Sequence, residues 1–358
     1  MRITLSNTEY ERWRYFAQQW NKRSELPALR AVTYVNDGKN VYVRCTNLKY
    51  WLQKPIFTRA SGKGICVVPT FYTVSDPTVE LHQTKQALTL NGRAVNTNEY
   101  EPFALPVPLD KLVPRVRCYR TDLIHAIQFA LPAMRSNPND VRFHGVRIVG
   151  TKTALLAEAT DTYRIHQKYI RATALTEPSE LVVYATEDLV VLLNMLNGTT
   201  VSIGAYDETA YIITDKNEYI FWQHRLQFPN TARALPDPAN QIARLRVSVH
   251  ALRNACKSLG KLKKARQAKT YFELTPDNRL MLTCAETENT ALVQLYSPPV
   301  EKPLEFALDR YFVLDLLNLL PSHATVDIGI YPYNNFVITD WQVVGNDSYY
   351  AAICGMTL

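Results

Sequence analysis

The feature that most constrains the fold of this chain is an internal repeat. The segment LLAEATDTYRIHQKYI from Leu155 is similar to LMLTCAETENTALVQLY from Leu280, and TVSIGAYDETAYIITD from Thr200 is similar to TVDIGIYPYNNFVITD from Thr325. Both pairs are offset by 125 positions, from Leu155 to Leu280 and from Thr200 to Thr325. Because two separate matches share one offset, we interpret them as copies of one folding unit.

A third, fainter copy precedes these two. The segment VYVRCTNLKYWLQKPI from Val41 has the same order of strand, small residue, polar turn and strand, and TVELHQTKQALTL from Thr78 takes the place of the later TV-x-I segments. Each copy also opens alike, with an alternating strand, a polar cap and an amphipathic helix. These three openings begin at Arg2, Val116 and Arg244.

A second helix is predicted in two of the copies, from Glu187 and from Asp309, just before the TV-x-I strand. The equivalent stretch of the first copy, Ile56 to Thr78, is shorter, rich in β-branched residues and contains Pro69 and Pro77, so its helix should be reduced or missing. We therefore predict an α+β fold of three tandem domains, with sheets outside and helices on one face. The predicted domains are residues 1–115, 116–240 and 241–358.

The charge of the chain suggests a polyanionic partner. The net charge is +7, and the stretch from Val247 to Tyr271 holds seven basic residues and no acid. Arg253, Lys257, Lys261 and Lys264 recur at helical spacing, opposite a predicted buried side of Leu252, Ala255, Cys256, Leu259 and Leu262. Such a face is either a solvated helix surface or a surface that follows DNA phosphates without reading sequence.

Catalytic and metal-binding motifs are not found. The six cysteines are scattered and the seven histidines dispersed, which predicts reduced thiols in a cytoplasmic protein without a metal site or cofactor. Gly62-Lys63-Gly64 is interpreted as a turn, and Asp161 as a turn-forming residue rather than a catalytic carboxylate. The first residues lack the apolar run of a signal peptide, and no stretch of the sequence is long and apolar enough for a membrane helix.

Three ordered motifs resemble those of the bacterial DNA polymerase III beta sliding clamps. RSELP from Arg23 is similar to the R-x-x-L-P that follows the first helix in that family, and ATDTYRI from Ala159 is similar to its ATD-x-x-R-L. FPNTARALP from Phe228 resembles FP-x-x-x-R-x-LP at the end of the second domain. The chain also stops, as those clamps do, on an apolar strand that runs to Leu358.

The resemblance implies a non-catalytic processivity factor. In that family, a head-to-tail homodimer forms a ring of six domains whose helices line the hole, and the ring encircles duplex DNA without sequence preference. The polymerase and the clamp loader insert short linear motifs into a pocket between domains two and three.

The same resemblance implies which residues contact partners and DNA. The expected peptide-binding residues are Phe143, Thr160, Arg164, Ile165, Pro229, Arg233, Ala234, Phe312, Tyr333, Asn335, Ile353, Cys354, Met356 and Leu358, with Arg164 and Arg233 at the rim of the pocket. An alternative interpretation places three of them, Ile165, Ile353 and Met356, in the hydrophobic core. The expected DNA-binding residues are Arg23, Arg135, Asn139, Arg253, Lys257, Lys261 and Lys264.

The chain departs from the family pattern in three places. The last residues are CGMTL, where the family usually has a proline and a basic residue, so motif preference should differ. The missing helix would thin the lining of the ring, and Lys261 lies where the family usually has an apolar residue at the dimer contact. Two other functions stay open, namely a clamp-fold interaction module that is not loaded on DNA and a nucleic-acid-processing enzyme with an unrecognised site.

Overall fold

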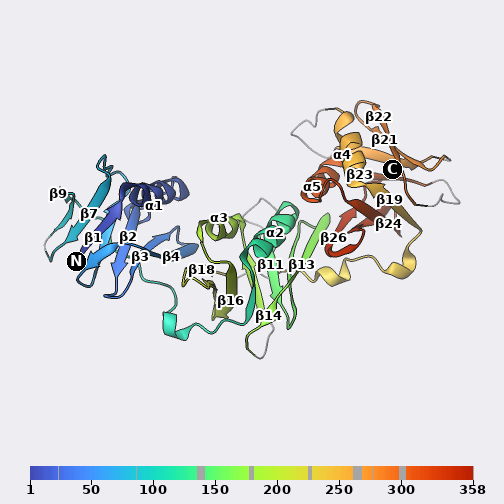
Figure 1. The fold of residues 1–358 in the computed structure, drawn as a ribbon. Coiled ribbons are helices and arrows are strands. Elements are labelled where there is room, and N and C mark those ends of the chain that lie inside the picture. Colours follow the sequence, from blue (N-terminus) through green and yellow to red (C-terminus); the bar gives the residue numbers. More distant parts are fainter. Residues whose placement is uncertain are drawn as a thin grey trace. The chain divides into compact units, whose positions relative to one another are not determined.

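The computed structural model describes residues 1–358 except 23, 86, 135–141, 177–180, 225–227, 261–267, 276, 298–303 and 358. The described residues form sheets with few helices, which confirms the predicted α+β class (Figure 1). Their contacts divide the chain into two compact units, each of which is described by itself. Unit 1 comprises Met1–Thr121, Ala172–Val183 and Asp188–Arg225, and unit 2 comprises Asp122–Arg171, Tyr184–Glu187 and Leu226–Leu358. The division into three domains stays a prediction.

Unit 1 contains two antiparallel sheets. The first has the order β5–β1–β7–β8–β9 and the second the order β14–β10–β16–β17–β18–β4–β3–β2–β6. The strands of the first are β1 (Arg2–Ser6), β5 (Arg59–Ser61), β7 (Thr78–Gln83), β8 (Leu88–Leu90) and β9 (Arg93–Val95). Those of the second are β2 (Ala31–Asn36), β3 (Val41–Thr46), β4 (Tyr50–Ile56), β6 (Gly64–Pro69), β10 (Val116–Tyr119), β14 (Thr173–Ala174), β16 (Thr200–Tyr206), β17 (Thr209–Thr214) and β18 (Tyr219–Gln223).

The helices of unit 1 begin where the sequence predicts. Helix α1 (Asn7–Trp20) starts after Ser6, whose side chain accepts a hydrogen bond from the Glu9 N–H and so satisfies one of the free donors of the first turn. Helix α3 (Glu187–Met195) precedes β16. Between Ile56 and Thr78 the chain forms β5 and β6 and no helix, in agreement with its β-branched composition.

Unit 2 also contains two sheets. One runs in the order β11–β12–β13–β26–β25–β24–β19 and the other in the order β22–β21–β20–β23. The strands of the first are β11 (Val146–Gly150), β12 (Ala154–Thr160), β13 (Arg164–Arg171), β19 (Ala243–Ser248), β24 (Thr325–Tyr333), β25 (Phe336–Val343) and β26 (Asn346–Cys354). Those of the second are β20 (Lys269–Leu274), β21 (Arg279–Cys284), β22 (Thr290–Gln294) and β23 (Glu305–Asp309). Strand β15 (Leu181–Ala185) is divided between the units.

The helices of unit 2 are α2 (Arg120–Ala130, in this unit from Asp122), α4 (Val249–Ser258) and α5 (Arg310–Leu319). Helices α4 and α5 pack over a core that contains Leu252, Cys256, Leu259 and Leu317. The predicted buried side of the α4 sequence is confirmed for its described members, because Leu252, Ala255, Cys256 and Leu259 are all buried.

Two glycines at equivalent positions show how closely the repeats correspond. Gly204 pairs with Tyr211, and Gly329, which lies 125 positions later, pairs with Asp340. A Cβ atom on either glycine would overlap the side chain of that cross-strand partner. Each strand therefore needs glycine because the neighbouring side chain lies over its backbone.

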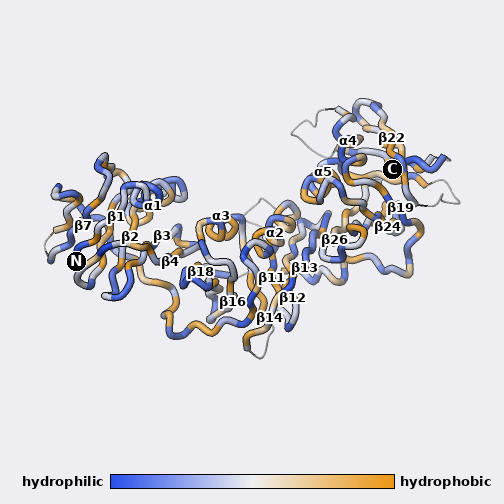
Figure 2. The backbone as a smooth tube through the Cα atoms, in the orientation of Figure 1, coloured by the Kyte–Doolittle hydropathy of each residue, from blue (hydrophilic) through white to orange (hydrophobic). Residues whose placement is uncertain are grey.

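Apolar residues are distributed in short stretches. In Figure 2 hydrophobic and hydrophilic segments alternate along the described backbone. Among the described residues, no helix has the length and hydropathy that crossing a membrane requires.

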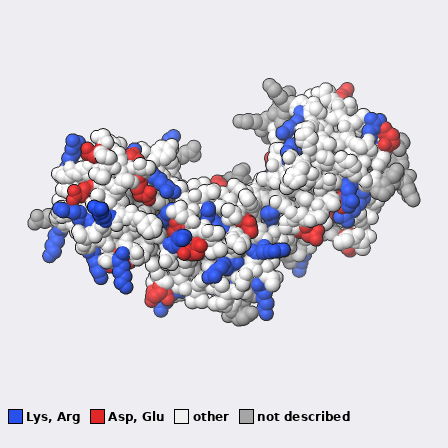
Figure 3. Space-filling view, viewed as in Figure 1, with Lys and Arg blue, Asp and Glu red and all other residues white. Residues whose placement is uncertain are grey.

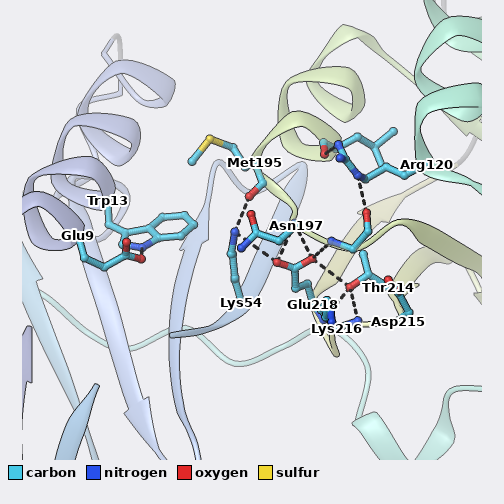
Figure 4. Close-up of polar contacts among 12 residues, drawn as sticks. Glu9, Trp13, Lys54, Arg120, Met195, Asn197, Thr214, Asp215, Lys216 and Glu218 are labelled. Carbon is cyan, nitrogen blue, oxygen red and sulfur yellow. Dashed lines mark hydrogen bonds and ion pairs between the residues drawn. The ribbon is translucent and has the colours of Figure 1, made fainter. Parts of the chain in front are cut away.

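A buried ion pair lies in unit 1 (Figure 4). The Lys54 Nζ on β4 lies 3.3 Å from the Glu218 Oε1, and both side chains are less than 5% exposed. Lys54 also donates to the Met195 carbonyl at 2.7 Å. The Glu218 carboxylate accepts from the N–H groups of Asn197 and Gly198 at 2.9 Å and from the Thr214 hydroxyl at 3.0 Å.

This pair connects strands from separate repeats, since β4 pairs with β18 next to it. Lys54 also lies 5.9 Å from the Trp13 ring of α1, and Met195 is the last residue of α3. Both helices therefore lie on the face of the nine-stranded sheet toward which Lys54 points.

We predict that Glu218→Gln lowers the free energy of unfolding by about 3–5 kcal/mol, because it leaves the Lys54 ammonium buried without its countercharge. The double variant Lys54→Met/Glu218→Gln should lose less free energy of unfolding than the two single variants lose together. The reason is that replacing Lys54 also removes the unpaired charge. Urea unfolding of the three variants measures both effects. Additive losses would contradict a coupled pair.

His166 on β13 is fully buried in unit 2, and its Nδ1 lies 3.0 Å from the Phe129 carbonyl of α2. Burial, with a smaller contribution from the nearby Arg164 charge, lowers the pKa of His166 to about 3. In the unfolded chain the imidazole should titrate near its ordinary pKa of about 6.5.

Below pH 6.5 the unfolded chain therefore binds a proton that the folded protein does not accept until about pH 3. The contribution of His166 to the free energy of unfolding is fully present above pH 6.5. It should fall by about 2 kcal/mol between pH 6.5 and pH 5. We predict that His166→Gln, which keeps a donor for the Phe129 carbonyl, loses this part of the pH dependence. Equal slopes of unfolding free energy against pH in both proteins would contradict the prediction.

Candidate functional site

The candidate site lies on the sheet of unit 2, where β13 pairs with the C-terminal strand β26. The register runs from Arg164 opposite Ile353 to Lys168 opposite Tyr349. Since paired residues share a face, Ile165 and Ala352 point to one side of the sheet. Arg164, His166 and Ile353 point to the other side, toward α2, α5 and the core.

A tight turn joins β12 to β13 at the edge of the site. The Asp161 carboxylate accepts hydrogen bonds from the N–H groups of Tyr163 and Arg164, both at 3.0 Å. Thr162 has a φ of 81°, a left-handed conformation that this side-chain bonding stabilises. The predicted turn-forming role of Asp161 is confirmed.

A cavity of about 220 Å³ opens on the face to which Ile165 and Ala352 point. Its walls come from the β12–β13 turn, from the segment Phe228–Ala234 with its short 3-10 helix Thr231–Arg233, and from β25 and β26. Most of the lining is apolar, with threonine and asparagine groups among it. The lining residues are Phe143, Thr160, Thr162, Tyr163, Arg164, Ile165, Pro229, Asn230, Thr231, Ala234, Ile338, Ala352 and Cys354.

A second, more polar hollow of about 560 Å³ lies beside the cavity and shares Tyr163 and Arg164 with it. Its other lining residues are Leu131, Pro132, Met134, His144, Asp161 and Glu187. An apolar cavity beside a polar hollow can hold the apolar side chains of a ligand while leaving its polar groups hydrated.

Arg164 lines both the cavity and the hollow, but it is not the exposed rim residue that was expected. Its guanidinium is buried on the helix side of the sheet, where it donates to Asp161 at 3.0 Å, to Asp315 of α5 at 2.8 Å and to the Pro132 carbonyl. It also lies 4.2 Å from the centre of the Phe312 ring. Arg164 therefore anchors β13 to α5, and its removal should affect stability before it affects binding.

The structure brings together about half of the expected peptide-binding residues. Seven of them line the cavity: Phe143, Thr160, Arg164, Ile165, Pro229, Ala234 and Cys354. Ile353 is fully buried in the core, so it is a core residue and not a cavity residue. Its neighbours Ala352 and Cys354 line the cavity because successive residues of a strand face opposite sides of the sheet. Arg233, Phe312, Tyr333, Asn335 and Met356 lie outside the cavity lining, and Leu358 lies outside the described residues.

Sequence reasoning missed Ala352 and Ile338, which form part of the cavity wall. Strand alternation could have identified Ala352, because it shares a face with Cys354 whereas Ile353 does not. Ile338 pairs with Cys354, and that register could not be read from the sequence. Thr162, Tyr163, Asn230 and Thr231 lie within the motifs but were not selected.

The predicted basic helix face can be followed only as far as helix α4, because Lys261 and Lys264 lie outside the described residues. Helix α4 ends at Ser258, and Gly260 has a φ of 102°, a conformation that glycine adopts easily after a helix. Arg253 donates to the carbonyls of Leu317 and Leu320 at the end of α5, so its charge stabilises that helix end. Lys257 is exposed on α4.

The other expected DNA-binding residues, Arg23, Arg135, Asn139, Lys261 and Lys264, lie outside the described residues. On the face seen in Figure 3, Lys and Arg side chains are interspersed with Asp and Glu and do not gather into a single patch. Among the residues that the structure describes, no group of histidine, cysteine and acidic side chains could hold a metal ion.

Comparison with known proteins gives structural likeness only. No protein-family model and no curated protein sequence matches the chain. The DNA polymerase sliding clamp of Bacillus subtilis has a TM-score of 0.83 at 13% identity, covering 100% of this chain and 99% of that one. The DNA polymerase III subunit beta of Pseudomonas aeruginosa has a TM-score of 0.83 at 17% identity, covering 99% and 100%.

The beta sliding clamp of C. crescentus, with polyethylene glycol bound to a region proposed to tether the beta-motif, has a TM-score of 0.81 at 13% identity, covering 100% and 99%. These likenesses extend over the whole chain at low sequence identity. The chain therefore has the fold of the bacterial DNA polymerase III beta sliding clamps.

Proposed function

We propose that this protein is a DNA sliding clamp, a non-catalytic, cytoplasmic processivity factor that encircles duplex DNA as a head-to-tail homodimer. Its cavity beside β13 and β26 receives short linear motifs of the polymerase and the clamp loader. The observation that carries the proposal is the apolar cavity at the ATDTYRI and FPNTARALP motifs, in a chain with the clamp fold along its whole length.

The chemistry of the cavity suits such a motif. Ile165, Ala352 and Pro229 provide an apolar lining for one or two aliphatic side chains. Binding energy in such sites concentrates in a few buried apolar anchors. A short flexible peptide loses ordering entropy on docking, so affinity should be roughly micromolar.

The expected DNA contacts are electrostatic. A ring holds DNA by topology, so its lining needs only diffuse phosphate contacts, and those leave it free to slide. The net charge of +7 and the basic stretch around Lys257 and Lys261 support this.

The second candidate is a clamp-fold interaction module that binds partners but is not loaded on DNA. The absence of a helix between Ile56 and Thr78 and the lysine at position 261 favour it. Retention on circular but not on linear DNA after incubation with a clamp loader distinguishes the two functions. In solution, the sliding clamp should have about twice the chain mass of 40.9 kDa, and a monomer at micromolar concentration would oppose a ring.

We predict that Ala352→Leu weakens binding of a leucine-containing, polymerase-type clamp-binding peptide at least tenfold. Ala352 is buried at the cavity wall, so the larger side chain can occupy the volume that an apolar anchor of the peptide would fill. Fluorescence anisotropy with a labelled peptide measures the change.

The matched control is Ala94→Leu, at an exposed position on β9, which should leave the peptide affinity unchanged. If Ala352→Leu is folded and binds as tightly as the unchanged protein, the peptide does not use this cavity.

We predict weak, sequence-independent binding to duplex DNA that falls steeply with salt. Replacing Lys257, Lys261 and Lys264 by serine should reduce the slope of log affinity against log salt by up to about 3, since each phosphate contact contributes about 0.9. Titrations of one labelled duplex at several salt concentrations give this slope.

The control replaces three exposed lysines in strand-to-strand turns, Lys39, Lys152 and Lys216, and removes the same net charge. An equal loss of slope in both triple variants would mean that the basic stretch has no special part in DNA binding.

A further inference from the structure

Glu158 lies in the middle of a polar stripe on the cavity side of the sheet. It pairs with Arg147 on β11 and with Gln167 on β13. The Arg147 Nη1 donates to its Oε1 at 2.6 Å, and the Gln167 Nε2 donates to its Oε2 at 3.0 Å. Glu158 is only 1% exposed, which is rare for a carboxylate on the outer face of a sheet.

The segment Phe228–Ala234 covers this stripe. The Thr231 hydroxyl donates to Oε2 of Glu158 at 2.8 Å, and the Phe228 ring lies 5.7 Å from the Arg147 guanidinium. Thr231 itself lines the cavity, together with its neighbours Pro229, Asn230 and Ala234. One side of this segment therefore rests on the polar stripe while the other side forms a wall of the cavity.

The contact between Thr231 and Glu158 should dominate the attachment of this wall. A hydrogen bond to an ionised acceptor is roughly twice as strong as one between neutral groups, and burial strengthens it further. Arg147 holds the carboxylate in place and contacts Phe228. Its guanidinium thus connects both attachment points of the segment.

We propose that Glu158 is the positioning residue of the cavity. Its carboxylate, acting through the Thr231 hydroxyl, holds the segment Phe228–Ala234 at the distance from β26 that fits an aliphatic side chain. The inference rests on the proposed function, since it assigns to the cavity an apolar anchor of a partner peptide. Its effect on the shape of the cavity can be measured without any peptide.

The test uses Glu158→Gln and Thr231→Val in the full chain. Thr231→Val removes only the hydroxyl, and Glu158→Gln removes the charge at nearly constant shape. Each should weaken binding of the leucine-containing clamp-binding peptide about tenfold, which corresponds to about 1.4 kcal/mol. The double variant should bind no more weakly than the single ones, because both changes break the same contact.

The second readout is alkylation of Cys354 by iodoacetamide. Cys354 lines the cavity and is partly exposed, whereas the other five cysteines are buried. Loosening the wall should speed alkylation of Cys354 at least threefold in both variants, and Cys354→Ser identifies the labelled thiol.

The matched control is Asp327→Asn, a carboxylate-to-amide change in the same unit. Asp327 pairs with Arg246 at 2.6 Å and does not line the cavity, so neither readout should change in this variant. A change there of the same size would mean that both readouts report general stability, and this result would overturn the proposal.

The outcomes separate the inference from the function on which it rests. If the unchanged protein binds no clamp-binding peptide, the proposed function fails, and the alkylation rates alone decide whether Glu158 positions the wall. If both variants are folded and show unchanged alkylation, Glu158 does not position the wall. Thr231→Val keeps the test decisive if Glu158→Gln does not fold.

Discussion

The backbone pairing of β13 with β26 is the interaction on which the candidate site depends. These strands belong to different copies of the repeat, and each would otherwise present an edge with unpaired N–H and C=O groups. The register from Arg164–Ile353 to Lys168–Tyr349 sets Ile165 beside Ala352 on one face. It also directs Arg164 and His166 toward α2 and α5 on the other face. A shift of one residue would exchange these faces and abolish the cavity.

Two buried carboxylates, one in each unit, hold irregular segments of the chain against a sheet. Glu218 binds the N–H groups that follow α3 and the Lys54 ammonium, and Glu158 binds Thr231, Gln167 and Arg147. Segments without regular backbone pairing need side-chain partners for their polar groups. Buried ionic contacts often add little net stability, but they restrict the geometry that a segment can adopt. In unit 2 the segment held in this way is a wall of the cavity.

Much of the fold could be predicted from the sequence because the repeats show the same local patterns several times. Local patterns alone predict where the helices start, including the second helices from Glu187 and Asp309. They also predict that the helix between Ile56 and Thr78 is reduced or missing. Pairing between copies, such as β4 with β18, is long-range, and no local signal indicates it.

For the site, the motifs located the turn at Asp161 and the segment at Pro229. They did not show which strand residues face the cavity, so Ile353 was selected in place of Ala352. The helix from Val249 was predicted too long because the conformation of Gly260 was not considered.

Backbone hydrogen bonds at the end of the last strand limit which substitutions are tolerated there. The N–H groups of Cys354, Gly355 and Met356 donate in turn to the carbonyls of Tyr163, Val337 and Ala307. A Cβ atom on Gly355 would also lie only 2.7 Å from the Val337 oxygen. Proline has no N–H to donate. Proline at any of these three positions would cost a backbone hydrogen bond, so the strand can accept it only if the surrounding strands change as well.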